Sequence, residues 1–117
     1  MFLPKITNSK ELSSQLINPK IYLALIQQIQ KDLQLIGIDF LLEEKPLQEE
    51  FLLQFQELIT VLIDTNFELF LNLLYRIDLD ENKIRNLIQS QNENLYALIT
   101  FEILKREWQK VWFRLNY

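Results

Sequence analysis

Residues 47–63 read LQEEFLLQFQELITVLI, and this stretch determines the fold class that we predict. Its apolar side chains recur at intervals of three and four residues, which is the spacing of one face of an α-helix. On a helical wheel they fill an arc of roughly 200°, wider than the stripe of a helix with a single neighbour. We therefore expect a central helix here, covered by other helices on more than one side.

Two N-capping patterns precede this stretch. Asn8 and Glu11 have the spacing of a capping box, ahead of a short helix. Asn18, which is followed by a proline, predicts the start of a second helix over residues 19–36. The only glycine of the chain follows that helix, where a left-handed helix end is expected. Residues 38–45 form a connector rich in apolar residues, and we expect it to fold back onto the core.

Helical spacing also continues after the central stretch. Residues 64–66 interrupt the apolar pattern, either as a turn or as a kink in one long helix. We expect further helices over residues 67–75, 80–88 and 93–117. Strict alternation of apolar and polar residues is absent, which argues against strands. The sequence predicts a single all-α domain, a compact irregular antiparallel bundle of four to six helices.

The composition removes most catalytic and metal chemistry. The chain of 117 residues has no cysteine, no histidine and a single glycine. These absences exclude disulfides, thiolate zinc sites, histidine-based nucleophilic catalysis and glycine-rich phosphate loops. The lack of cysteine also suits a reducing compartment. We expect a non-catalytic cytoplasmic protein with no cofactor and no metal.

The charge is unevenly distributed. The whole chain carries a net charge of −4, whereas residues 105–117 carry one acid and four bases. An acidic body does not favour nonspecific binding to nucleic acid, although the basic end keeps that partner open. No apolar run approaches the roughly 18 residues that a membrane span needs, so we expect no membrane partner.

The basic end has a regular pattern. Arg106, Lys110 and Arg114 recur every fourth residue, with Phe113 and Tyr117 beside them. We interpret these five residues as a solvated helix face or, when functional, as a candidate interaction surface. The surface could contact a protein partner or a second copy of the chain. A basic stripe with aromatic neighbours could also contact phosphates and stack on bases.

A second constellation surrounds Arg76. It precedes an acidic loop that contains Asp78 and Asp80. We predict a structural ion pair between Arg76 and one of these aspartates, which would fix the turn. Alternatives are that Arg76 anchors a ligand carboxylate, or that the loop binds a divalent cation through oxygen ligands. Because the loop lacks the glycine of a helix-loop-helix calcium site, we favour helix capping by Asp80.

Three short motifs carry a resemblance to a group of known proteins. LYRID at residues 74–78 and KREWQKVW at residues 105–112, together with GIDF at residues 37–40, resemble a group of small all-helical bacterial proteins. These proteins are found chiefly in Bacteroidetes, and the resemblance covers roughly residues 20–117. It implies a small cytoplasmic helical protein with no known activity. It therefore supplies no functional residues.

We conclude that the most plausible function is a non-catalytic one. The excess of apolar residues in the central helix and in the 38–45 connector favours a protein-interaction or self-associating protein, such as a homodimer. One alternative is a nucleic-acid-associated regulator that uses the basic stripe. Another is a bundle that binds a small ligand between Tyr75, Trp108 and Trp112.

Overall fold

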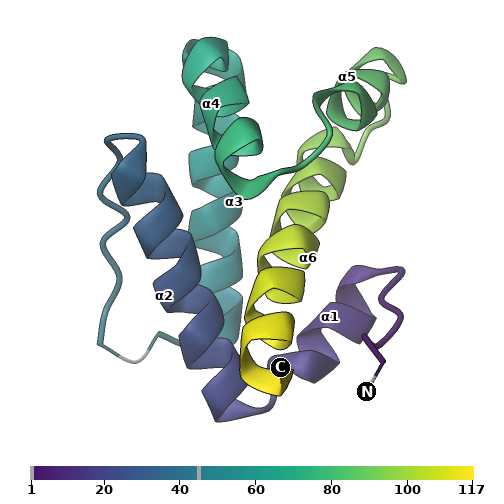
Figure 1. The fold of residues 1–117 in the computed structure, drawn as a ribbon. Helices are drawn as coiled ribbons and strands as arrows, with labels where there is room; N and C mark the ends of the chain where they lie inside the picture. Colours follow the sequence, from purple (N-terminus) through teal and green to yellow (C-terminus); the bar gives the residue numbers. More distant parts are fainter. Residues whose placement is uncertain (1, 45) are drawn as a thin grey trace.

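A computed structural model describes residues 2–44 and 46–117, and in this part of the chain all regular structure is helical (Figure 1). The helices are α1 (Ser9–Gln15), α2 (Pro19–Leu35), α3 (Gln48–Thr65), α4 (Phe67–Ile77), α5 (Glu81–Gln89) and α6 (Leu95–Asn116). The radius of gyration is 13.7 Å, close to the roughly 13 Å of a folded domain of this size. The predicted compact all-α bundle is confirmed.

Helix α6 is the centre of the bundle. It packs against α2, α3, α4 and α5, whereas α3 packs against α4 and α6. In Figure 1, α6 runs antiparallel to both α2 and α3, as expected, but α2 and α3 run in the same direction. The reason is that residues 38–44 return alongside α2 before α3 begins. An extended chain rises about 3.3 Å per residue, so a short connector is long enough for this return.

Local capping sets the helix boundaries. The Asn8 side chain accepts from the Glu11 N–H at 2.9 Å, and Asn18 caps α2, so both predicted starts are confirmed. The predicted interruption at residues 64–66 is confined to Asn66, because α3 continues through Thr65 and the chain turns at the next residue. Asn66 leaves the helical conformation and its side chain accepts from the Leu69 N–H at 3.2 Å, which starts α4. Gly37 has a φ of +90°, the left-handed conformation that glycine tolerates best.

The core contains an aromatic layer beneath the connector. Phe51 and Phe55 lie one helical turn apart on α3, and both are buried. Phe40 packs on them, with its ring centroid 5.8 Å from that of Phe55 and 6.3 Å from that of Phe51. The connector therefore folds back onto the core as predicted. None of the helices in the described part of the chain is both long and apolar enough to cross a membrane.

Candidate functional site

A buried polar cluster lies where α2, α4 and α6 meet. We call it the polar seam and define it by Gln28 and Asp32 of α2, Arg76 of α4, and Glu107 and Lys110 of α6. The side chains of Asp32 and Glu107 are almost fully buried, at 1 % residual exposure for each residue. Acidic residues are rarely buried to this degree unless they are paired. The seam therefore needs a specific electrostatic explanation.

Asp32 accepts hydrogen bonds on both carboxylate oxygens. Lys110 Nζ donates to Oδ2 at 2.8 Å, and Gln28 Nε2 donates to the same oxygen at 2.9 Å. Arg76 Nε approaches Oδ1 at 3.4 Å. Because Gln28 precedes Asp32 by one helical turn, α2 positions this donor itself, whereas α4 and α6 bring the two cations.

Glu107 faces Asp32 from the opposite helix, and both buried carboxyls flank the ammonium group of Lys110. Burial, together with the hydrogen bond to Asp32 and its negative charge, raises the pKa of Glu107 to about 8. Burial also disfavours the charged form of Asp32, but hydrogen bonds from Glu107, Lys110 and Gln28 outweigh it and lower its pKa. At neutral pH the pair therefore holds one proton, on Glu107.

Lys110 lies between the two carboxyls. Its Nζ is 3.2 Å from Glu107 Oε1, although this oxygen has no hydrogen bond of proper geometry. Since the buried pair is closed to solvent, a substrate would not reach it. The arrangement can hold and release a proton, and it can join three helices.

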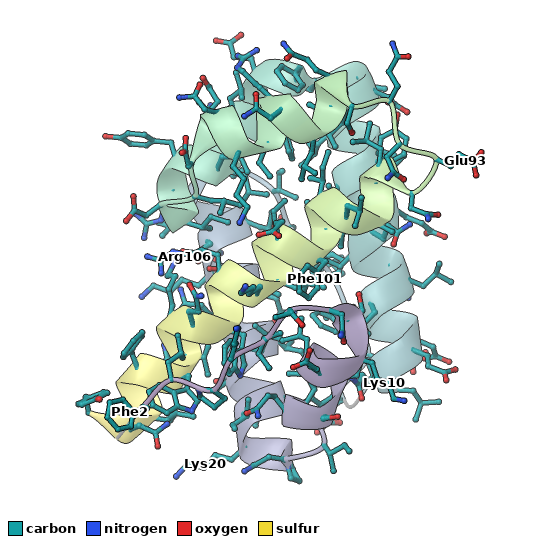
Figure 2. The ribbon with its side chains drawn as sticks, turned by 90° about the vertical axis from the view of Figure 1, so that its right-hand side faces the viewer. Phe2, Lys10, Lys20, Glu93, Phe101 and Arg106 are labelled. Carbon is teal, nitrogen blue, oxygen red and sulfur yellow. The ribbon has the colours of Figure 1, made fainter. Side chains whose placement is uncertain are left out.

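The cations of the predicted basic stripe bind neighbouring helices of the same chain, although Arg106 and Lys110 are half-buried and Arg114 is exposed. Arg106 Nε donates to the Ile77 carbonyl at 2.9 Å, and Arg106 is labelled on α6 in Figure 2. Lys110 binds Asp32, and Arg114 Nη1 donates to Gln28 Oε1 at 2.9 Å. All three cations thus hold α6 to α2 or α4. The interpretation of this stripe as a solvated face therefore does not describe the half-buried Arg106 and Lys110, whereas Arg114 is exposed to solvent as well as bonded to α2.

The predicted ion pair of Arg76 with Asp78 or Asp80 was also wrong. Arg76 pairs with Asp32, whereas the exposed Asp78 lies 3.6 Å from Arg106 Nη2. The expected capping role of Asp80 is confirmed, since its side chain accepts from the Asn82 N–H at 2.9 Å. A buried carboxylate needs a cation beside it. Arg76 on the neighbouring helix α4 supplies one to Asp32, which explains why Arg76 turns toward it.

The aromatic residues at the end of α6 form a small surface cluster. The ring of Phe113 lies 5.4 Å from that of Trp112 and 5.7 Å from that of Tyr117. Phe113 and Tyr117 are exposed. We call these three residues the aromatic end. Trp108 is fully buried and Tyr75 almost fully exposed, so the structure does not bring Tyr75 and the tryptophans together as a ligand lining.

A groove runs between α2 and the connector, and we call it the α2 groove. Its volume is about 640 Å³. The lining includes Pro19, Tyr22, Leu23, Ile26, Leu42, Glu43 and Glu44. Tyr22 Oη donates to the Pro46 carbonyl at 2.8 Å, and Gln30 Nε2 donates to the Phe40 carbonyl at 3.1 Å. These two bonds fix the connector as the second wall. Sequence patterns gave no signal for the groove, because its walls meet only after the connector has returned.

Comparisons with known proteins give no relative. No family model, no curated protein and no solved structure matches the chain. The resemblance to small helical bacterial proteins therefore stays a prediction. In the described part of the chain, no group of three or more acidic side chains is placed to hold a metal ion.

Proposed function

We propose that the chain is a non-catalytic, cytoplasmic protein-interaction protein that binds a partner segment in the α2 groove. The observation that carries this proposal is an apolar groove of about 640 Å³ with an acidic rim. Leu23 forms part of the α2 wall of the groove, and 53 % of its surface is accessible to solvent. Leu42 forms part of the opposite wall, on the connector. Exposed apolar surface bordered by polar residues is typical of a docking site.

The charge of the groove indicates the chemistry of the partner. Among the residues that the structure describes, Glu43 and Glu44 are the charged residues that line the groove. An amphipathic helix with apolar residues on one face and lysines or arginines on the other fits this pattern. Complementary charge would orient the segment and speed its association.

The geometry favours this function over the other two. A nucleic-acid-associated regulator would need Arg106, Lys110 and Arg114 to contact phosphates, but each of them already contacts a neighbouring helix of the same chain. A ligand site between Tyr75 and the two tryptophans lacks a common pocket.

Fluorescence anisotropy with two labelled model peptides tests the proposal. The peptides share one apolar helical face and carry either lysines or glutamates on the other. We expect the basic peptide to bind, with an affinity that falls as salt is added, and the acidic peptide not to bind. Equal binding of the two peptides, or no binding of either, would contradict the proposal.

Charge reversal then locates the site. We expect the double variant Glu43→Lys/Glu44→Lys to lose the basic peptide and to gain the acidic one. The matched control is Glu57→Lys/Glu93→Lys, which makes the same change of net charge at two exposed positions that do not line the groove. Glu93 lies in the loop before α6 (Figure 2). An equal effect of the two double variants would place the binding elsewhere.

Self-association is a second candidate, and one observation favours it. The chain carries both an apolar groove and an exposed aromatic end, so a second copy offers an apolar occupant for the groove. Phe113 and Leu115 are partly exposed there and could enter the groove of another copy. A monomer at high micromolar concentration in sedimentation velocity would contradict this candidate.

A further inference from the structure

We infer that Asp32 and Glu107 form a proton-controlled latch between α2 and α6. With one proton shared between them, the carboxyls hold the C-terminal half of α6 against α2 and α4. Loss of the proton at mildly alkaline pH separates them and loosens residues 107–117. This regulatory device is independent of the proposed function, since it concerns the polar seam and not the α2 groove.

The geometry of the pair carries the inference. The two carboxyls come from different helices, are each 1 % exposed, and flank the same ammonium group, with Lys110 Nζ 2.8 Å from Asp32 Oδ2 and 3.2 Å from Glu107 Oε1. Two buried carboxylates in contact repel each other, whereas a carboxylic acid donates a hydrogen bond to a carboxylate. One proton therefore turns a repulsive contact into an attractive one. This change of sign distinguishes the pair from an ordinary buried salt bridge.

The surrounding charges do not replace the proton. In the described part of the chain, Lys110 of α6 is the one cation that forms an ion pair with Glu107, at 3.2 Å from Oε1, and burial and Asp32 outweigh its lowering of the Glu107 pKa. Arg76 of α4 approaches Asp32 only, and Arg106 is bound to Ile77 and Asp78. Helices α1, α3 and α5 contribute no ion pair or hydrogen bond to the two carboxyls among the residues described.

The titration range supports the same conclusion. Burial and the adjoining Asp32 raise the pKa of Glu107 to about 8. The seam therefore loses its proton within a range that a folded protein tolerates, whereas an exposed glutamate would titrate near 4.3. Asp32 stays ionised throughout this range because its pKa is lowered.

The two tryptophans give a direct readout of the latch. The chain has two, Trp108 and Trp112, and both lie on α6 within five residues of Glu107 and are buried. Intrinsic fluorescence is recorded from about pH 6 to about pH 9, where an ordinary tyrosine with a pKa of about 10 stays largely protonated. We expect a red shift of the emission with a midpoint near pH 8. Glu107→Gln should remove this transition, because glutamine keeps a hydrogen-bond donor at every pH.

Two further variants keep the test decisive if Glu107→Gln folds poorly. Glu102→Gln removes a charge from the same helix, where Glu102 pairs with Lys83 outside the seam, and should leave the midpoint unchanged. Asp32→Asn removes the neighbouring negative charge and should lower the midpoint by at least one pH unit. An unshifted midpoint in Asp32→Asn, or no transition in the unmodified chain, would overturn the latch.

Amide hydrogen exchange measured by NMR locates the change. After correction for the intrinsic pH dependence of exchange, we expect protection to fall between pH 7 and about pH 9 over residues 108–117. Residues 51–62 of α3 should lose only the protection that the fall in the global free energy of unfolding, measured in urea, accounts for. A uniform loss of protection across both helices would mean global destabilisation and would overturn a local latch.

Discussion

At the scale of single residues, Glu107 couples the free energy of unfolding to pH. The pKa of this residue is about 8 in the folded chain, above its ordinary value of 4.5. Between these two values the folded state keeps a proton that the unfolded state has released. The stabilising contribution is therefore complete below about pH 4.5 and is lost as pH rises to about 8. In urea unfolding we expect stability to fall by up to about 1.4 kcal/mol per pH unit over this interval.

Matched variants isolate that contribution. Glu107→Gln should remove the slope, whereas Glu102→Gln should retain it. Asp32 acts in the opposite sense: because its pKa is lowered, its contribution is present above its ordinary pKa of 3.8 and is lost as pH falls. A stability that does not change between pH 5 and about 8 in the unmodified chain would contradict the assignment of the proton to Glu107.

A second residue-scale prediction concerns Thr100. This residue is 3 % exposed, and its hydroxyl has no hydrogen-bond partner. Valine has the same shape without the polar atom, so Thr100→Val should raise the free energy of unfolding by about 1 kcal/mol. The control is Thr60→Val, because the Thr60 hydroxyl donates to the Gln56 carbonyl at 2.8 Å and its removal should give no gain. A loss of stability in Thr100→Val would indicate that water satisfies the hydroxyl, since a small hollow of about 170 Å³ adjoins it.

At the scale of helices, Lys110 joins α6 to α2. Replacing it with methionine keeps most of the side-chain volume and leaves the buried Asp32 without its shortest hydrogen bond. Removing one partner of a buried ion pair costs about 3 kcal/mol, and we expect a loss of that order in thermal or urea unfolding. Arg85→Met is the control. Arg85 pairs with Glu81 on the surface of α5, where such pairs contribute less than about 0.5 kcal/mol. Equal effects would show that the seam is no stronger than a surface pair.

The same helices show how far the sequence can be interpreted. Asn8 and Asn18 cap the helices that follow them, and such local hydrogen bonds are predictable because all the partners lie within three residues. The orientation of Arg106 and Lys110 was not predictable in this way. A helical wheel separates apolar from polar faces, but it cannot distinguish water from a neighbouring helix that offers a carbonyl or a carboxylate. A weak signal existed in the i, i+4 spacing of Gln28 and Asp32 beside the apolar face of α2.

At the scale of the whole molecule, the chain return after α2 has the largest consequences. It makes α2 and α3 run in the same direction. It also forms the second wall of the α2 groove, from connector residues that are distant in sequence from most of the α2 residues in the first wall. Periodicity predicts that the connector is apolar, but not which helix it lies against. The fold class could therefore be predicted, whereas the groove and the polar seam depend on tertiary contacts.

The α2 groove and the aromatic end lie on the same molecule. If the aromatic end of one copy occupies the α2 groove of another, each contact joins two different surfaces. Leu23→Glu should then disable the groove, and Phe113→Glu should disable the aromatic end. Both positions are exposed, so both variants should fold. In sedimentation velocity we expect each variant alone to be monomeric, whereas the unmodified chain associates as its concentration rises.

Mixing the two variants provides the decisive comparison. The Leu23→Glu chain keeps an intact aromatic end, and the Phe113→Glu chain keeps an intact groove, so an equimolar mixture should form a one-to-one heterodimer and nothing larger. Leu53→Glu is the control, because Leu53 is exposed on α3 and does not line the groove; this variant should associate like the unmodified chain. A mixture that stays monomeric while the unmodified chain associates would show that the copies meet through other surfaces. The occupant of the α2 groove would then be a segment of a different protein and not the aromatic end of a second copy.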